Sequence, residues 1–465
     1  MIQLTIAGAA GGEVTGSCYI LETGKARVMI DCGLFQGGAD TDELNVNPLG
    51  TKKKLDAVLI THAHLDHVGR LPLLKKSGFN GPIHATPATA ELAALILRDS
   101  ARIEASDTER LNIRRMRAGE SLVQPRYTTG EAEAVIRQFQ NAPYQEPVEI
   151  APGIQATWAE AGHMLGSGSI LLTVRDGKTQ KKIVFSGDLG PRNTPINRNF
   201  EPFKAADLVF LESTYGTRDH RPIKETVDEF RTVVKKAVAQ KGKILIPTFA
   251  VGRAQLLTLM LSQMFRTENV PSFPIFLDSP MAIEATRIYG RHPELYDDEL
   301  LAYIKERPMA ADLKTLRATE SADESRAINA MEGPLLVMAG AGMCTGGRIL
   351  HHFKANLWKS QTHVLFVGYQ SAGTLGRRLV DGAKDIHLFG EKIAVKAQIH
   401  TIGGLSAHAG GTDLLAWFEA INPAPKQVFL THGEDRARKA LAQALFKKHK
   451  IRAELPALNQ TISLS

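Results

Sequence analysis

The feature that most constrains this chain is residues 61–67, Thr-His-Ala-His-Leu-Asp-His, with three imidazoles and one carboxylate in six consecutive positions. It directly follows the apolar run 57–60, which is typical of a buried strand. Side chains at a strand end are held by a rigid frame, so these groups would keep a fixed geometry. The alternative is a polar turn with histidines placed by chance, and the density of ligand types argues against it.

Spacing within the stretch predicts two metal positions. His62 and His64 are two residues apart and can turn to the same side to bind one ion. Asp66 and His67 follow the bend and face a second ion. Neutral imidazole and carboxylate suit Zn²⁺, with Mn²⁺ or iron as alternatives. Residues 66–74 carry leucines among polar side chains and are expected to begin a short helix.

Length and composition bound the class of protein. At 465 residues the chain exceeds one ordinary core, so we expect two domains. No apolar run reaches the length that a bilayer requires, and residues 1–6 alternate like a strand rather than a signal peptide. Its three cysteines lie far apart, which favours reduced thiols in a cytoplasmic protein without a membrane partner. The net charge of +7 is compatible with a polyanionic partner but does not establish one.

Further acidic or imidazole residues lie at the ends of other segments whose patterns predict strands. They are Asp31 after 27–30, His163 after 154–159, Asp188 within 182–188 and Glu212 within 207–216. Alone, Asp31 would be a capping aspartate, and a lone histidine among glycines would be unremarkable. Their recurrence at strand ends is the layout of a site assembled at one edge of packed sheets.

Between residues 87 and 140 the pattern is helical and highly charged. We expect a solvated helical excursion there, with an RNA-contacting surface as the alternative.

After Gly216, helical segments alternate with the short apolar strands 243–246, 274–277, 335–339 and 363–367, which predicts a parallel α/β sheet. Glycine-rich loops follow these strands and either cradle phosphates or serve as ordinary helix-entry turns. Arg253, Arg348 and Arg377 lie near these loops and are candidates for contacts with a nucleic-acid backbone.

The His-x-His-x-Asp-His stretch, with Asp31, His163 and Asp188, resembles the metallo-β-lactamase family. The resemblance implies an α/β fold, a four-layered αββα sandwich with a dinuclear metal site along one edge. It implies that the first metal is bound by His62, His64 and His163, that the second is bound by Asp66 and His67, and that Asp188 bridges the two.

The segments after Gly216 resemble the β-CASP domain, a cap inserted into nucleases of that superfamily, and the likeness covers essentially the whole chain. Glu212, His408 and His432 match later motifs of the group, and His432 ends the strand 426–432. The implied division is 1–214 for the first part of the metallo-β-lactamase domain, 215–392 for the β-CASP domain and 393–465 for the second part, opening with a strand over 393–401. The nearest kin are compact enzymes resembling the endonuclease subunit of the cleavage and polyadenylation specificity factor.

The resemblance implies roles for the remaining site residues. Asp31 would orient a ligand histidine or the bridging hydroxide, and Asp66 would serve in metal binding and catalysis. Glu212 would hold His408, which would act as general acid toward the departing 3′ oxygen. Ser406 would bind the scissile phosphate. His432 would be the third ligand of the second metal, where the DNA-processing branch carries an apolar residue.

These features predict a metal-dependent ribonuclease with two Zn²⁺ per chain, Mn²⁺ being the alternative, that hydrolyses single-stranded RNA to 5′-phosphate and 3′-hydroxyl ends. It would act as an endonuclease in RNA processing or decay. A 5′–3′ exonuclease activity and a homodimer are left open. The alternatives are a β-CASP DNA nuclease, a small-molecule metallo-hydrolase of the same fold and a non-catalytic RNA-binding scaffold. A scaffold would have lost metal ligands, and a small-molecule hydrolase would need neither the insertion nor His408 and His432.

Overall fold

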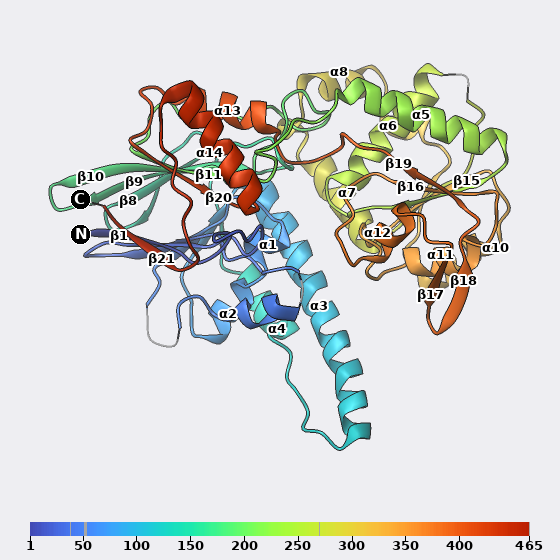
Figure 1. Cartoon of the computed structure of the whole chain (residues 1–465), viewed down its shortest axis with the longest axis horizontal. Helices are drawn as coiled ribbons and strands as arrows, with labels where there is room; N and C mark the ends of the chain where they lie inside the picture. The colour runs from blue at the N-terminus through green and yellow to red at the C-terminus, as the bar shows by residue number, and fades with distance from the viewer. Residues whose placement is uncertain (38, 51–53, 269, 465) are drawn as a thin grey trace. The chain divides into compact units, whose positions relative to one another are not determined.

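The computed structural model describes residues 1–37, 39–50, 54–268 and 270–464. The chain divides into two compact units, coloured along the chain in Figure 1. The first unit comprises residues 1–193, 197–219 and 408–465, and the second comprises residues 194–196 and 220–407.

Two facing sheets form the centre of the first unit. The first sheet has the order β21-β1-β2-β3-β4-β5-β6 and the second has the order β20-β11-β10-β9-β8-β7. The strands of the first are β1 (Ile2–Ile6), β2 (Tyr19–Glu22), β3 (Arg27–Ile30), β4 (Ala57–Leu59), β5 (Ile83–Ala85), β6 (Phe139–Asn141) and β21 (Gln460–Leu464). Those of the second are β7 (Val148–Ala151), β8 (Ile154–Glu160), β9 (Gly168–Asp176), β10 (Thr179–Phe185), β11 (Leu208–Glu212) and β20 (Gln427–Thr431). Buried side chains of both sheets, such as Leu4, Leu59, Trp158 and Phe210, form one core.

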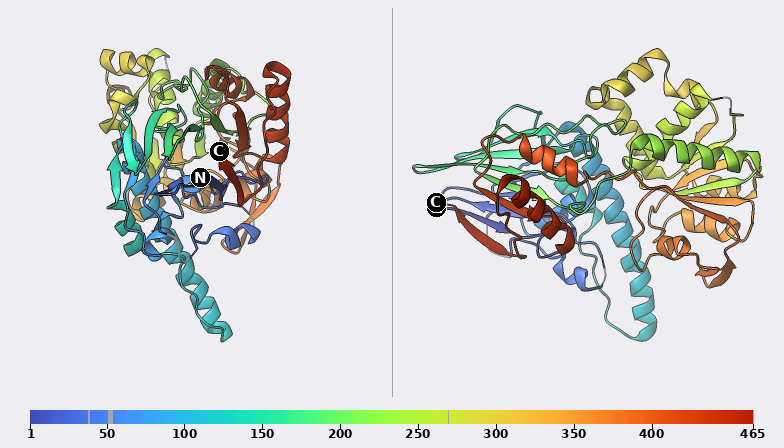
Figure 2. Two further views of the ribbon diagram at one scale, coloured as in Figure 1. Left: turned by 90° about the vertical axis from the view of Figure 1, so that its left-hand side faces the viewer. Right: turned by 45° about the horizontal axis from the view of Figure 1, so that its top comes forward.

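Helices cover the two outer faces of this pair of sheets. On the first sheet lie α1 (Leu65–Val68), α2 (Leu71–Lys76), α3 (Pro87–Ala118) and α4 (Thr129–Ile136), seen in Figure 1, and the 3₁₀ helix η1 (Ala39–Leu44) precedes them in the chain. On the second lie α13 (Gly411–Glu419) and α14 (Asp435–His449), whose Trp417 and Leu441 pack with Val209 and Leu430. The predicted αββα sandwich is confirmed. Strands β1 and β21 pair antiparallel, so the two chain ends lie together (Figure 2).

Parallel strands bring the predicted ligands to common edges. Strands β10, β11 and β20 run parallel, so their carboxyl ends open on the same side of the second sheet. Asp188, Glu212 and His432 lie at or just beyond these ends. In the first sheet β3 and β4 are parallel and lead to Asp31 and to the histidine stretch. This topology is the reason that residues far apart in sequence meet.

Two predicted helical segments of the first unit are divided in the structure. The helix expected from residue 66 ends at Val68 and a second one begins at Leu71, because Pro72 has no backbone N–H to donate to the carbonyl of Val68. The helical segment predicted over 87–140 contains the long helix α3, a loop and the short helix α4. Helix α4 begins with a capping box formed by Thr128 and Glu131. The far half of α3 is largely exposed, as expected for a solvated helix.

The second unit is a parallel sheet covered by helices on both faces. Its strand order is β14-β13-β15-β12-β16-β19. The strands are β12 (Lys243–Pro247), β13 (Ile275–Asp278), β14 (Leu316–Ala318), β15 (Leu335–Ala339), β16 (Thr362–Phe366) and β19 (Gln398–Thr401), with the hairpin β17 (Asp385–Leu388) and β18 (Glu391–Ala394) beside them. The helices are α5 (Ile223–Ala239), α6 (Arg253–Thr267), α7 (Pro280–Arg291), η2 (Pro293–Leu295), α8 (Asp298–Glu306), α9 (Met309–Asp312), α10 (Ala322–Ala330), α11 (Ile349–Asn356) and α12 (Leu375–Val380).

Alternate residues of β12 point to opposite cores, because side chains alternate along a strand. Ile244 and Ile246 pack with Phe230 of α5, whereas Leu245 packs with Phe353 of α11. The predicted parallel α/β architecture of the insertion is therefore confirmed.

The single strand predicted over 393–401 is wrong. Residues Glu391–Ala394 form β18 of the hairpin, and Gln398–Thr401 form β19, which pairs in parallel with β16 of the second unit. Because these hydrogen bonds hold β19 in the inserted sheet, the compact first unit resumes at His408. Among the described residues, no helix is long and apolar enough to cross a membrane.

Candidate metal centre

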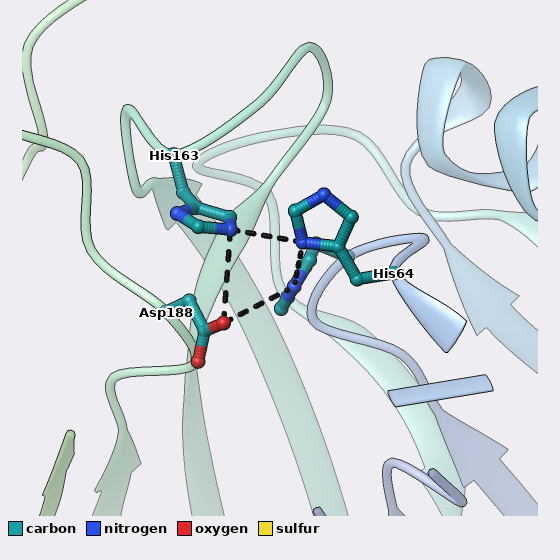
Figure 3. Close-up of side chains that lie close together, drawn as sticks. His64, His163 and Asp188 are labelled. Carbon is teal, nitrogen blue, oxygen red and sulfur yellow. Dashed lines mark hydrogen bonds and ion pairs between the residues drawn. The ribbon is translucent and has the colours of Figure 1, made fainter. Parts of the chain in front are cut away.

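Four predicted ligands of the first metal position meet in the first unit. His64 Nδ1 lies 3.2 Å from His62 Nε2 and 3.0 Å from His163 Nε2. Asp188 Oδ2 lies 3.4 Å from His62 Nε2 and 3.6 Å from His163 Nε2. Figure 3 shows His64, His163 and Asp188 with their polar atoms directed toward one another.

The predicted ligands of the second position meet beside the first set. His432 Nε2 lies 3.3 Å from His67 Nε2 and 3.4 Å from Asp66 Oδ2. Asp188 Oδ1 lies 3.4 Å from both His67 Nε2 and His432 Nε2. The two oxygens of Asp188 therefore face different ligand sets, Oδ2 toward the first and Oδ1 toward the second.

These distances fit tetrahedral coordination. A tetrahedral ion with metal–nitrogen bonds of about 2.0–2.1 Å places its ligand atoms about 3.3 Å apart. The ligand–ligand distances in both sets, from 3.0 to 3.6 Å, cluster around that value. Asp188 Oδ1 is buried and has no hydrogen-bond partner within the described part of the chain, as expected of an oxygen that a cation would satisfy. The donor set thus fits divalent metal ions.

Neighbouring groups fix the ligand rings. Asp31 Oδ2 accepts a hydrogen bond from His67 Nδ1 at 2.7 Å, which turns Nε2 of that ring toward Asp188. The Thr61 hydroxyl and backbone N–H donate to the two oxygens of Asp31, both at 2.8 Å. On the other side, Thr214 Oγ1 lies 3.2 Å from His432 Nδ1. The rings of His67 and His432 are therefore oriented through their second nitrogen.

Backbone conformation contributes to the same placement. Asp31 and His432 adopt φ values of +56° and +50°, in the left-handed region that residues with a Cβ rarely occupy. The backbone N–H of His432 is bound by the Ala9 carbonyl at 2.7 Å, which holds the turn. Such strained residues cluster at functional sites because the surrounding structure must hold them.

A second acidic–imidazole pair lies next to the ligands. Glu212 is 1% exposed and accepts hydrogen bonds from the backbone N–H groups of Leu189 at 2.9 Å and Thr214 at 3.1 Å. Its Oε1 lies 3.3 Å from His408 Nδ1, as expected from the sequence. His408 Nδ1 is also 3.8 Å from Asp188 Oδ2, and ligand-type atoms of Asp188, His408 and His432 lie close enough to share an ion.

Burial and charge set the protonation of these groups. Burial lowers the pKa of His62 and of His64, so both rings are neutral, which is the form that binds a metal. Burial would raise the pKa of Asp188, but the surrounding imidazoles hold it well below its usual value. For His408, burial is outweighed by the carboxylates of Glu212 and Asp188, which raise its pKa to about 9.

The predicted substrate-binding residues belong to the second unit and are not part of this cluster. Arg348 donates to Asp278 and to the carbonyl groups of Thr319 and Glu320, so its guanidinium serves a buried network. Arg377 of α12 is exposed and pairs with Asp381, the residue directly after that helix. Arg253 begins α6 and is half-buried. Ser406 is half-buried, two residues before His408.

Sequence reasoning missed the groups that hold the ligands. Thr61 and Thr214 carry hydroxyls against Asp31 and His432, and Leu189 supplies a backbone N–H to Glu212. The position of Thr61, directly before His62, is a signal that could have identified it. Nothing in the sequence identifies the contact of Thr214 with His432 or that of Leu189 with Glu212, because these partners lie 218 and 23 residues apart.

Family comparisons agree with this architecture. Residues 11–248 match the metallo-beta-lactamase superfamily, residues 254–379 match the Beta-Casp domain and residues 392–456 match the Zn-dependent metallo-hydrolase RNA specificity domain. A crystal structure of a protein of unknown function from Enterococcus faecalis V583 is similar in fold, with a TM-score of 0.57, 13% sequence identity and full coverage of both chains.

Two related proteins match this chain over nearly its whole length. The chain is 37% identical over 437 residues to ribonuclease TTHA0252 of Thermus thermophilus, covering 94% of each chain. It is 32% identical over 472 residues to the transcription termination factor FttA of Methanosarcina mazei, covering 98% of this chain and 71% of the relative. The chain therefore belongs to the metallo-β-lactamase superfamily, within the group that carries a Beta-Casp domain.

Proposed function

We propose that this protein is a metal-dependent ribonuclease that hydrolyses phosphodiester bonds of single-stranded RNA with two zinc ions per chain. The observation that carries the proposal is Asp188, whose two oxygens face separate ligand sets. That arrangement supports a dinuclear site of the kind used in phosphodiester hydrolysis. The match to an RNA specificity domain and the similarity to ribonuclease TTHA0252 favour RNA over DNA or a small molecule.

We assign a proposed role to each residue of the candidate metal centre. His62, His64 and His163 would hold the first ion, and Asp66, His67 and His432 the second, with Asp188 shared between them. Asp31 would keep His67 in the tautomer that presents Nε2, supported by the 2.7 Å contact at Nδ1. Two divalent ions held in this way would lower the pKa of a water molecule and neutralise charge on the phosphate oxygens.

Proton transfer to the leaving group would fall to His408. Its Nδ1 lies against Glu212, so the imidazolium would hand its other ring proton to the departing 3′ oxygen. With its pKa raised to about 9, His408 carries that proton at neutral pH. Cleavage in this manner gives a 5′-phosphate and a 3′-hydroxyl, and the 2′-hydroxyl takes no part.

The remaining predictions concern substrate and setting. Ser406, Arg253 and Arg377 stay candidates for RNA contacts, whereas the contacts of Arg348 with Asp278 favour a structural role. We propose a cytoplasmic setting in RNA processing or decay. Endonuclease action is expected, and a 5′–3′ exonuclease activity and a homodimer remain open.

End-labelled substrates test this function. The zinc-loaded protein is incubated with a 5′-labelled single-stranded RNA, the matching DNA and an RNA duplex, and the ends of the products are mapped. The proposal expects internal cleavage of the single-stranded RNA alone, leaving 5′-phosphate and 3′-hydroxyl ends. Preferential cleavage of DNA, or 2′,3′-cyclic phosphate products, would contradict it.

A further inference from the structure

Three neighbouring strands of the second unit open into adjacent loops. Strand β12 lies between β15 and β16 and pairs in parallel with both. Their carboxyl ends therefore meet at one edge of the sheet, where the loops 248–252, 340–347 and 367–374 follow. Edges of this kind are common ligand-binding positions in α/β sheets.

Phe249 lies in the loop 248–252, which follows the central strand β12, and its ring contacts both of the other loops. A Cβ atom on Gly342 would lie 2.8 Å from Cδ2 and 2.9 Å from Cε2 of Phe249, and one on Gly368 would lie 4.0 Å from Cε2. The ring therefore rests against glycine backbone from the loops on either side. It is nevertheless 46% exposed, and the next residue after Gly368, Tyr369, is 61% exposed. Both side chains are therefore accessible to a ligand in solution.

A buried amide fixes the loops around this ring. Gln370 is 5% exposed, and its Nε2 donates to the carbonyl of Gly342 at 3.0 Å and to that of Tyr369 at 3.1 Å. Ser371 Oγ contacts Met343 Sδ at 3.3 Å, joining the same two loops again. The frame is held by specific bonds while the ring is left uncovered, which is the arrangement of a preorganised contact surface.

Surrounding residues favour a nucleobase over a protein partner. Phe249 lies against Gly342 and Gly368, and the polar residues Gln370 and Ser371 follow Tyr369 in the chain. Arg377, in the helix α12 that follows this loop, is exposed and pairs with Asp381. Separate aromatic faces beside a cation are the pattern on which single-stranded nucleic acids bind, the bases stacking and the phosphates pairing with the charge.

We propose that Phe249, with Tyr369 beside it, is a stacking surface for bases of the single-stranded substrate. This inference rests on the proposed ribonuclease function and assigns part of its substrate recognition to two uncharged residues. Stacking on one aromatic ring predicts that its removal weakens binding of single-stranded RNA by about 5- to 100-fold, with little dependence on base identity.

The test uses the full chain in an Asp188→Ala background, so that the RNA stays intact. A single-stranded RNA containing 2-aminopurine reports stacking through fluorescence quenching, and anisotropy of an end-labelled RNA gives the Kd. Phe249→Ala is expected to weaken binding and reduce quenching. Phe249→Tyr should retain both, and Phe249→Leu, which keeps apolar volume without an aromatic face, should behave like the alanine variant.

Two further variants separate stacking from general damage. Gly342→Ala would push the Phe249 ring from its place and should weaken binding although the ring is present. Phe389→Ala removes an aromatic ring that is 55% exposed at the β17–β18 hairpin and should bind like the parent. Circular dichroism and thermal melts confirm that each variant is folded.

Outcomes distinguish this inference from the function on which it rests. If the wild-type protein cleaves single-stranded RNA and Phe249→Ala binds RNA as tightly as the parent, the stacking surface is refuted and the ribonuclease function stands. If Phe249-dependent quenching is observed but the wild-type protein cuts no RNA, the stacking surface is supported and the function is refuted. If the zinc-loaded protein neither binds nor cuts RNA, both are refuted.

Discussion

At the scale of single residues, Asp188 connects the whole candidate centre. Its side chain is 2% exposed, and its two oxygens face four imidazole nitrogens at 3.4–3.6 Å. A buried carboxylate is costly unless cationic groups compensate it, because the charge is removed from water. This geometry supports the proposal that Asp188 is shared between two metal positions.

Replacing this carboxylate should affect both positions at once. We expect Asp188→Ala to abolish RNA cleavage and to lower bound metal below two equivalents per chain, since each set loses one oxygen ligand. Elemental analysis and a cleavage assay on the same preparation measure both quantities. Near-normal turnover in this variant would mean that the bridging role lies elsewhere.

His408 provides the complementary residue-scale test. Its contact with Glu212 supports the proposed role in proton transfer, whereas its 3.8 Å distance from Asp188 would also allow a ligand role. We expect His408→Ala to slow cleavage by about 10²–10⁴-fold, the usual cost of losing a general acid, with metal content unchanged. Loss of metal together with activity would instead make His408 a ligand.

At the scale of elements, glycines determine how closely the ligand loops approach one another. A Cβ on Gly33 would lie 1.5 Å from the carbonyl oxygen of Asp66, and a Cβ on Gly190 would lie 2.8 Å from the backbone nitrogen of His163. Each contact involves backbone, so neither clash can be relieved by rotating a side chain. The turn carrying Asp66 and His67 thus depends on Gly33, and the loop carrying His163 depends on Gly190.

Substitution of one glycine should therefore affect one metal position. We expect Gly33→Ala to displace Asp66 and His67, so that the second ion is lost while His62, His64 and His163 retain about one equivalent. His432→Ala, which removes a ligand of the same set, should give the same stoichiometry.

Metal titration followed by elemental analysis measures the stoichiometry of both variants. Gly290→Ala in α7 is the matched control, because nothing lies within 4 Å of the added Cβ. Two tightly bound ions in Gly33→Ala would contradict the role assigned to this turn.

A buried polar network at the end of β13 makes stability depend on pH. Burial would raise the pKa of Asp278, but hydrogen bonds from His352, Ser325 and Arg348 outweigh it and hold the pKa below its usual value. Because the folded pKa is lower than that of the unfolded chain, near 3.9, the carboxylate stabilises the fold fully above about pH 4. That stabilisation is lost as the pH falls through the folded pKa.

Removing the charge should remove this dependence. We expect Asp278→Asn to be less stable at pH 7 by about 3–5 kcal/mol, the cost of breaking one side of a buried pair. Its thermal midpoint should also fall less steeply between pH 5 and pH 3 than that of the wild type. Calorimetry over this range measures both, with Asp323→Asn, an exposed acid on α10, as the control. Parallel curves for wild type and Asp278→Asn would refute the assignment.

The same network shows where sequence reasoning fails. The ligand stretch 61–67 was predictable because its signal is local, consisting of ligand types directly after an apolar strand. The partner of Arg348 was not, because Asp278 is 70 residues away and only the parallel sheet brings them together. Similarly, the sequence of residues 393–401 has the pattern of one continuous strand. In the structure its first part pairs within a hairpin and its last part pairs with the inserted sheet.

At the scale of the whole molecule, the first unit is built from an N-terminal and a C-terminal segment of the sequence. Strand β21 pairs with β1, and β20 with His432 completes the sheet that carries Asp188 and Glu212. The second unit is inserted between these parts and has its own cores on both faces of its sheet. The order of motifs predicted this insertion, but its boundaries depend on strand pairing that the sequence does not reveal.

The most direct test of the account follows cleavage as metal is returned. The full chain is stripped with a chelator and titrated with zinc while bound metal and cleavage of single-stranded RNA are measured on the same samples. With two ligand sets sharing Asp188, we predict saturation at two equivalents per chain and cleavage that appears with the second equivalent. Full cleavage by the metal-free protein, or no uptake of zinc, would contradict the central claim.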